Sequence, residues 1–185
     1  MLTKKEALSL VKKNITKRTT LYHMIAVEAI MESLARHLGE NEKLWGLTGL
    51  LHDIDYEKTE SNPEKHGLLS EEILSDFDVP VEVVRAIKAH NFHHTHIQPE
   101  NKIEKALIAC DAISGLLVAC ALVMPTKKLA DVKVDTVARK FKDKSFARGV
   151  ERERILFCEE FGIPKDKFFK IALNGLKDVS SEINL

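Results

Sequence analysis

The stretch Leu50-Leu51-His52-Asp53-Ile54-Asp55-Tyr56 places a histidine beside an aspartate at the end of an apolar run. Both of these side chains can bind one metal ion, and such a pair seldom has a purely structural role. Imidazole nitrogen suits zinc, iron or manganese, whereas carboxylate oxygen suits hard divalent ions. The pair therefore predicts part of a metal site whose other ligands come from elsewhere in the chain.

Around this stretch, helical periodicity extends through almost all of the 185 residues. No sustained alternation of apolar and polar residues predicts a strand. The sequence thus predicts an all-α fold with short connections, and a polar loop over 91–100. Gly39, Pro63 and Gly162 stand where helix ends are expected. The expected helices lie near 3–13, 18–38, 41–51, 63–76, 80–90, 101–123, 134–141, 150–161 and 164–181.

The chain changes character at Pro125, which interrupts a long apolar segment. We expect residues 1–124 to form a core and residues 125–185 to form a helical extension packed on it. From Lys127 to Arg154 there are ten basic and five acidic residues, an excess of about five positive charges in this stretch. The whole chain balances 28 basic against 28 acidic residues, so nucleic-acid binding is not expected.

The cysteines and the apolar segments bear on the compartment. Three cysteines without framework spacing predict reduced thiols, and the N-terminal residues lack the apolar segment of a signal peptide. The segment from Ala106 to Met124 is long enough to raise the question of a membrane span. However, Asp111 lies inside it, and a central acid costs roughly 2.5–3.5 kcal/mol on insertion scales. We therefore expect a buried helix and a cytoplasmic protein without membrane contact.

Three further histidines, His23, His66 and His90, share apolar stripes with aliphatic residues at helical spacing. A lone inward histidine is more often a hydrogen-bonded core residue than a ligand. Each buried neutral imidazole needs both a donor and an acceptor partner, and meeting that demand three times is costly. One metal site would satisfy several of these histidines at once.

Asp111 is the only charged residue between Ala106 and Met124. A carboxylate in such surroundings is driven to find a basic partner, to become protonated, or to bind a metal. No basic residue on the same predicted helix serves the first of these options. The metal is therefore the favoured partner of Asp111.

In chain order these residues form the pattern H…HD…H…H…D, which resembles the HD-domain superfamily of metal-dependent phosphohydrolases over roughly residues 18–124. The segments around His23, His52 and His90 resemble the corresponding family helices as well. The fold implied is an HD-domain helical bundle. The resemblance further implies one or two divalent ions of iron, manganese, zinc, cobalt or nickel, with Asp53 bridging two of them. The implied ligands are His23, His52, Asp53, His66, His90 and Asp111.

Several details bear on the branch of this superfamily. His66-Gly67 together with His90 resembles the binuclear branch that cleaves dinucleoside tetraphosphates. Tyr56 stands where some HD nucleotidases carry a glutamate, which weakens a deoxynucleotide 5′-monophosphatase reading. Asn91 follows His90, and a Gly-Tyr-Pro motif is absent, so the cyclic-di-GMP phosphodiesterase branch is rejected. Lys144-Ser145-Phe146-Ala147 resembles an uncharacterised group of predicted HD hydrolases.

The resemblance implies a phosphatase or phosphodiesterase that cleaves a phosphate ester or anhydride of a nucleotide, or of a similar small phosphate compound, by metal-activated water. Asp53 and Asp55 are the expected catalytic residues, with Asp55 or a free histidine assisting proton transfer. The alternative is a catalytically silent, metal-stabilised helical module that binds a nucleotide or a protein partner. A homodimer is left open. The expected phosphate contacts are Arg18, Lys88, Lys144 and Arg148.

Overall fold

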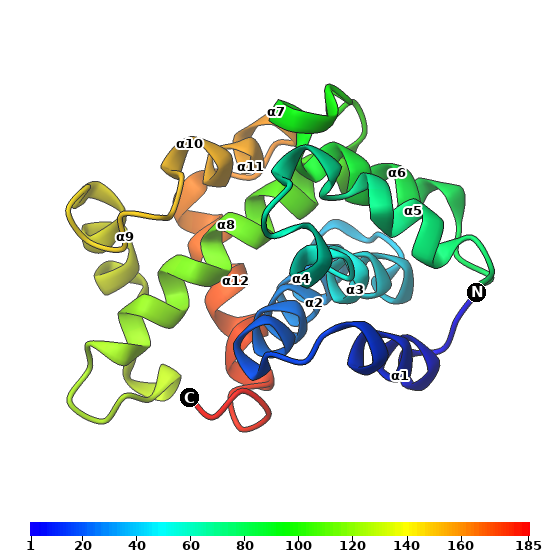
Figure 1. Cartoon of the computed structure of the whole chain (residues 1–185). Helices are drawn as coiled ribbons and strands as arrows, with labels where there is room; N and C mark the ends of the chain where they lie inside the picture. The colour runs from blue at the N-terminus through cyan, green and yellow to red at the C-terminus, as the bar shows by residue number, and fades with distance from the viewer.

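Two long helices, α2 (Arg18–Leu38) and α8 (Lys102–Leu122), form the centre of the molecule. Figure 1 shows the other main helices arranged around them. α3 (Glu42–Leu51) and α12 (Lys165–Asp178) pack against α2, and α6 (Val81–His90) packs against α8. These helices bury the apolar faces that the periodicity predicts.

The computed structural model describes residues 1–185 and contains helices but no strand, which confirms the all-α prediction. Gly39 ends α2 in the left-handed conformation, as its position predicts, with φ of 71°. The shorter elements are α1 (Lys4–Asn14), α4 (Tyr56–Thr59), η1 (Pro63–Lys65), α5 (Leu68–Leu74), α7 (Phe92–Thr95), η2 (Leu129–Asp131), α9 (Val134–Lys142), α10 (Arg152–Ile155) and α11 (Phe157–Glu160).

α8 is long and apolar enough to cross a membrane by length and composition alone. In this structure 67% of the most apolar 18-residue stretch of this helix is buried inside the protein, in agreement with the expected buried helix. The helix ends at Leu122, before Pro125. Cys110 and Cys120 on α8 are buried free thiols, as is Cys158.

Three local predictions are wrong. The helix expected over 63–76 is broken after η1, because Gly67 has φ of +87° and α5 begins only at Leu68. The helix expected over 150–161 divides into α10 and α11 at Leu156, whose N–H bonds to carbonyls three and four residues back. The polar loop 91–100 contains the helical turn α7, which ends at His96 in the left-handed conformation.

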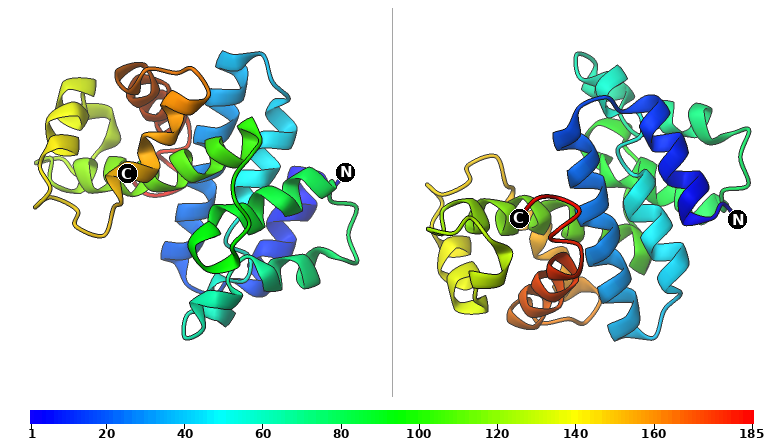
Figure 2. Two further views of the ribbon diagram at one scale, coloured as in Figure 1. Left: turned by 90° about the horizontal axis from the view of Figure 1, so that it is seen from above. Right: turned by 90° about the horizontal axis from the view of Figure 1, so that it is seen from below.

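The C-terminal residues share one hydrophobic core with the rest of the chain, and that core extends from Ala7 to Ile183. Figure 2 shows α12 running alongside α2. The contact is close, because the Ser33 hydroxyl donates to the Ile171 carbonyl at 3.1 Å, and a Cβ added at Gly175 would lie 2.7 Å from the Ala29 carbonyl oxygen. The boundary expected at residue 124 stays a prediction.

Candidate metal centre

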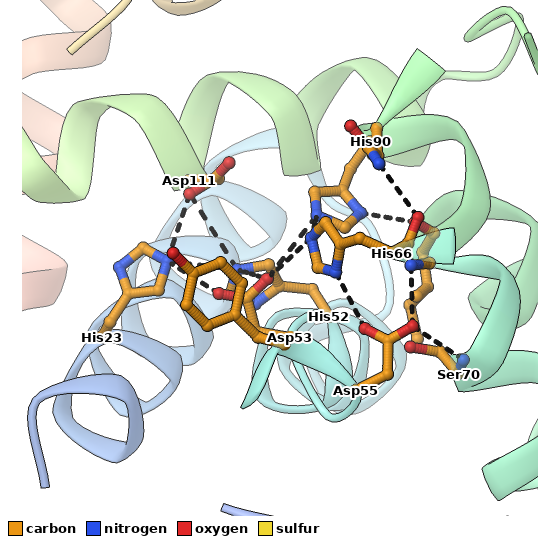
Figure 3. Close-up of polar contacts among 12 residues, drawn as sticks. His23, His52, Asp53, Asp55, His66, Ser70, His90 and Asp111 are labelled. Carbon is orange, nitrogen blue, oxygen red and sulfur yellow. Dashed lines mark hydrogen bonds and ion pairs between the residues drawn. The ribbon is translucent and has the colours of Figure 1, made fainter. Parts of the chain in front are cut away.

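The six predicted metal ligands converge on one side of the α2, α3 and α8 assembly, as Figure 3 shows. Their donor atoms form overlapping groups of three, within which all atoms lie within 4.8 Å of one another. His23 comes from the first turns of α2, and His52 and Asp53 follow the end of α3. The others are His66, just before α5, His90 at the end of α6, and Asp111 in the middle of α8.

Asp53 lies between two sets of histidines. Its Oδ1 is 3.3 Å from Nε2 of both His52 and His66 and 3.6 Å from Nε2 of His90. Its Oδ2 is 3.6 Å from Nε2 of His23. One carboxylate therefore contacts ligands contributed by four different segments of the chain.

Asp111 closes the opposite side of the cluster. Its Oδ1 lies 3.1 Å from His23 Nε2 and 3.9 Å from His52 Nε2. Its Oδ2 lies 3.4 Å from the Nη2 of Arg154. The carboxylate on the apolar helix α8 thus has a basic neighbour from another element, in addition to the histidines.

Each histidine of the cluster is held from behind through its Nδ1. The Nδ1 of His52 contacts the Gly49 carbonyl at 2.8 Å, and that of His90 contacts the Ile87 carbonyl. These carbonyls can only accept, so both imidazoles carry the proton on Nδ1 and present a lone pair at Nε2. Backbone acceptors of this kind orient the imidazoles that bind metals.

His66 and His23 are arranged in the same way. His66 Nδ1 lies 2.8 Å from Asp55 Oδ1, and His23 Nδ1 lies 3.1 Å from the Ser114 hydroxyl. That hydroxyl donates its own proton to the Asp111 carbonyl, so it accepts from His23. In their neutral forms all four imidazoles therefore direct Nε2 lone pairs into the cluster.

Facing lone pairs are unfavourable unless a cation lies among them. His23 and His52 bring their Nε2 atoms to 3.2 Å, and His66 and His90 bring theirs to 3.0 Å. A proton can separate one such pair, whereas four imidazoles and two carboxylates form the mixed nitrogen and oxygen set that transition metals prefer. The residues of the cluster therefore fit a divalent metal ion.

The pKa shifts of the clustered side chains also indicate a site that favours a cation. Burial would raise the pKa of Asp53, but His52, His66 and His90 hold it well below the usual range. Burial also lowers the pKa of His66, yet Asp53 and Asp55 outweigh it and raise that pKa to about 10. For His90, burial dominates and lowers the pKa. The cluster thus favours added positive charge but cannot place it on every ring.

For Asp111 and His23 as well, neighbouring charges outweigh the effect of burial on the pKa. Burial opposes ionisation of Asp111, but His23, His52 and Arg154 lower its pKa below the usual range. Burial lowers the pKa of His23, and Asp111 and Asp53 more than restore it.

Asp55 stands behind the cluster, although the sequence predicts it as a proton-transfer group. It is fully buried and accepts hydrogen bonds from His66 Nδ1 and from the backbone N–H groups of Gly67 and Ser70 at 2.8–2.9 Å. It is also absent from the lining of the cavity above the cluster. This placement supports a role in holding His66 and not the predicted contact with the reacting groups.

A cavity of about 500 Å³ opens over the cluster, and five of the six predicted ligands line it. His52 lies beneath them and has no exposed surface. Tyr56 and Asn91 also line the cavity, although their only sequence signal is adjacency to the ligand motifs. The full lining is Thr19, Thr20, His23, Asp53, Tyr56, His66, His90, Asn91, Asp111 and Arg154.

None of the four predicted phosphate contacts lines this cavity. Arg18 donates to the Tyr22 hydroxyl, and Lys88 pairs with Glu71 at 2.8 Å. Lys144 and Arg148 are exposed in the segment after α9. The basic residue that does reach the cavity is Arg154, and no periodic signal separates it from the other basic residues of its stretch.

Comparison with known proteins identifies the HD domain over residues 20–114, which is more than half of the chain. Among curated proteins, Ribonuclease Y of Acholeplasma laidlawii is 34% identical over 98 residues, and that of Aliarcobacter butzleri is 35% identical over 98 residues. Each match covers 53% of this chain and 18% of the relative. Ribonuclease Y of Sulfurovum sp. is 25% identical over 169 residues, covering 90% of this chain and 33% of the relative.

The chain thus spans a third or less of these relatives, and no solved structure matches it. The family match begins just before His23 and ends just after Asp111, so it encloses every residue of the cluster. This chain belongs to the HD domain family of metal-dependent phosphohydrolases.

Proposed function

We propose that this protein hydrolyses a phosphate ester or anhydride of a nucleotide, or of a similar small phosphate compound, with the help of divalent metal. The observation that carries the proposal is the convergence of four Nε2 lone pairs and two carboxylates at the base of one open cavity. That cavity, about 500 Å³, is of the size that small-molecule sites usually have.

The candidate ligands form three overlapping groups; one is His52, His90 and Asp111, and the other two share Asp53. His23, His52 and Asp53 form one group, and Asp53, His66 and His90 form another. Because Asp53 belongs to both of these groups, its carboxylate would be able to serve two ions. Such ions would activate water and offset negative charge on phosphoryl oxygens.

Other residues of the chain orient the candidate ligands. Asp55, Gly49 and Ser114 keep the imidazole rings oriented through their Nδ1 atoms. Asn91 holds the turn that carries His66, because its Nδ2 donates to the Pro63 and His66 carbonyls at 2.9 and 3.0 Å. These contacts are made before any substrate enters, so the site is largely pre-organised.

A second substrate class is an RNA phosphodiester. It is supported by the similarity to three proteins named Ribonuclease Y, although the matched segment is a small part of each. A cytoplasmic location also belongs to the proposal, supported by three buried free thiols.

The test combines metal analysis with a hydrolysis panel. The panel holds nucleotides, dinucleoside polyphosphates, cyclic nucleotides, a chromogenic phosphodiester and a short single-stranded RNA. We expect stoichiometric divalent metal in the purified protein and hydrolysis that is lost in Asp53→Ala. The exposed Asp76→Asn serves as the matched control.

Two outcomes would count against the proposal. If the wild type holds no stoichiometric metal under any supplementation, the metal-dependent function is wrong. If it holds metal but hydrolyses nothing faster than Asp53→Ala does, the chain is a silent binding module. Cleavage of RNA alone would select the second substrate class.

A further inference from the structure

Arg154 reaches the cavity from outside the family-matched residues 20–114. It is the only lysine or arginine in the cavity lining, and it also lines an adjoining cavity of about 180 Å³. The α10 helix that carries it packs against α8, which carries Asp111. The C-terminal part of the chain thereby places the positively charged Arg154 side chain at the edge of the cluster of candidate ligands.

The guanidinium of Arg154 is held at Nη2, whereas Nη1 makes only one long ion-pair contact. Its Nη2 donates to the His90 carbonyl at 2.6 Å and approaches Asp111 Oδ2 at 3.4 Å. Its Nη1 is 3.9 Å from a carboxylate oxygen of Glu151, and its Nε is buried without a hydrogen-bond partner. The anchored group therefore keeps donors that the protein does not use.

Arg152, two residues earlier, fixes the approach to α10. Its guanidinium donates only to backbone carbonyls, including those of Ala147 and Val150 at 2.7 Å. This arrangement holds Ala147 in the left-handed region, with φ of 46°. Two of these hydrogen bonds are made to the Lys144-Ser145-Phe146-Ala147 motif, at the carbonyls of Phe146 and Ala147. The other carbonyls that Arg152 contacts are those of Lys140, Phe141 and Asp143.

We propose that Arg154 binds the phosphoryl group of the substrate and that Arg152 is the residue that positions it. This inference rests on the proposed function and names the contact that recognises the phosphate. Guanidinium groups match phosphate oxygens with paired hydrogen bonds, and contacts of this charged kind are stronger than neutral ones. The competing explanation is that Arg154 only holds Asp111 in place.

The test measures binding of inorganic phosphate to the metal-loaded 185-residue chain by titration calorimetry. Arg154→Gln should weaken phosphate binding about tenfold or more, because it removes a charged hydrogen-bond donor. Arg154→Lys should retain part of the affinity. Metal content should stay at the wild-type level in both variants. The exposed Arg139→Gln, from the same basic stretch, should bind phosphate as the wild type does.

Unchanged phosphate affinity in Arg154→Gln, with metal and hydrolysis retained, would overturn the inference and leave the proposed function standing. Loss of metal in both Arg154 variants would show that the residue serves Asp111 instead. A wild type without metal or hydrolysis whose phosphate binding still depends on Arg154 would overturn only the proposed function. Circular dichroism shows whether each variant is folded.

The positioning role of Arg152 is tested by a double-mutant cycle. Arg152→Gln should weaken phosphate binding in the same direction as Arg154→Gln. The double variant should bind no more weakly than Arg154→Gln alone, because Arg152 acts through Arg154. Additive losses in the double variant would show that Arg152 acts independently of Arg154.

Discussion

Asp55 links the candidate ligand His66 to the neighbouring backbone through hydrogen bonds. One of its oxygens accepts from His66 Nδ1, and the other accepts from the N–H groups of Gly67 and Ser70. All three donors belong to the segment that positions His66. A carboxylate is suited to this place because it accepts at both oxygens and donates at neither.

We therefore expect Asp55→Asn to weaken metal binding by roughly 10- to 100-fold, the usual effect of losing a partner that orients a ligand. The amide has one accepting oxygen for three donors, and its NH₂ group faces a donor. Competition with a chromogenic chelator measures the affinity. The exposed Asp76→Asn is the control, and equal affinities of the two variants would contradict this role.

Glu28 is a buried acid on α2 that lies away from the metal cluster. Its carboxylate is 3.0 Å from Lys4 Nζ, and Glu32 and Glu182 add negative charge nearby. Burial raises its pKa to about 7 from the ordinary 4.5, and Lys4 offsets only part of that rise. Ionising Glu28 therefore costs folding stability.

The sign of the pH dependence follows from the raised pKa. The folded state holds the proton more tightly, so the stability is fully present below about pH 4.5 and falls as the pH rises towards 7. Above pH 7, Glu28→Gln should be more stable than the wild type by on the order of 3 kcal/mol. Urea unfolding of metal-free protein across this range measures the difference. The exposed Glu64→Gln should show no such trend, and a constant difference for Glu28→Gln would rule out this account.

Among the elements, the turn between η1 and α5 departs furthest from its predicted form. His66 does lie beside the other ligands, but it belongs to no helix, because Gly67 turns the chain with φ of +87°. A hydrophobic pattern records which positions are apolar and carries no information on the sign of φ. Periodicity alone therefore could not reveal this break.

Gly67→Ala should lower metal affinity as well as stability. A Cβ at this position meets the Ile87 carbonyl oxygen at 3.0 Å, and the positive φ adds about 1–2 kcal/mol of strain. Gly39→Ala is the matched control, since Gly39 also has positive φ but no atom within 4 Å of the added Cβ. Chelator competition and urea unfolding together separate the two effects. Equal metal affinity in both variants would show that the turn does not set the position of His66.

At the scale of the whole molecule, one core joins the family-matched residues to the C-terminal helices. α12 packs along α2, the helix that carries His23, and α10 brings Arg154 to α8. The convergence of the six candidate ligands was predictable because each stands in an apolar pattern and the set resembles a known family. Arg154 was not, because it follows Asp111 by 43 residues and resembles its basic neighbours in sequence.

The contact between α12 and α2 depends on a small residue. A Cβ at Gly175 would lie 2.6 Å from Ser33 Cβ and 2.7 Å from the Ala29 carbonyl oxygen. Gly175→Ala should therefore reduce the free energy of unfolding by about 1–3 kcal/mol, the usual cost of overpacking. Gly149→Ala is the control, because its added Cβ has no neighbour within 4 Å. Urea unfolding of metal-free protein measures both, and equal values would contradict tight packing here.

The order of the site residues along the chain has a consequence for biosynthesis. Asp111 is the last of the six ligands, and Arg154 emerges from the ribosome 43 residues after it. A growing chain therefore contains every candidate metal ligand before it contains the arginine at the cavity edge or the helix α12 that packs on α2. The candidate metal centre is thus translated in full before the arginine that we propose binds phosphate.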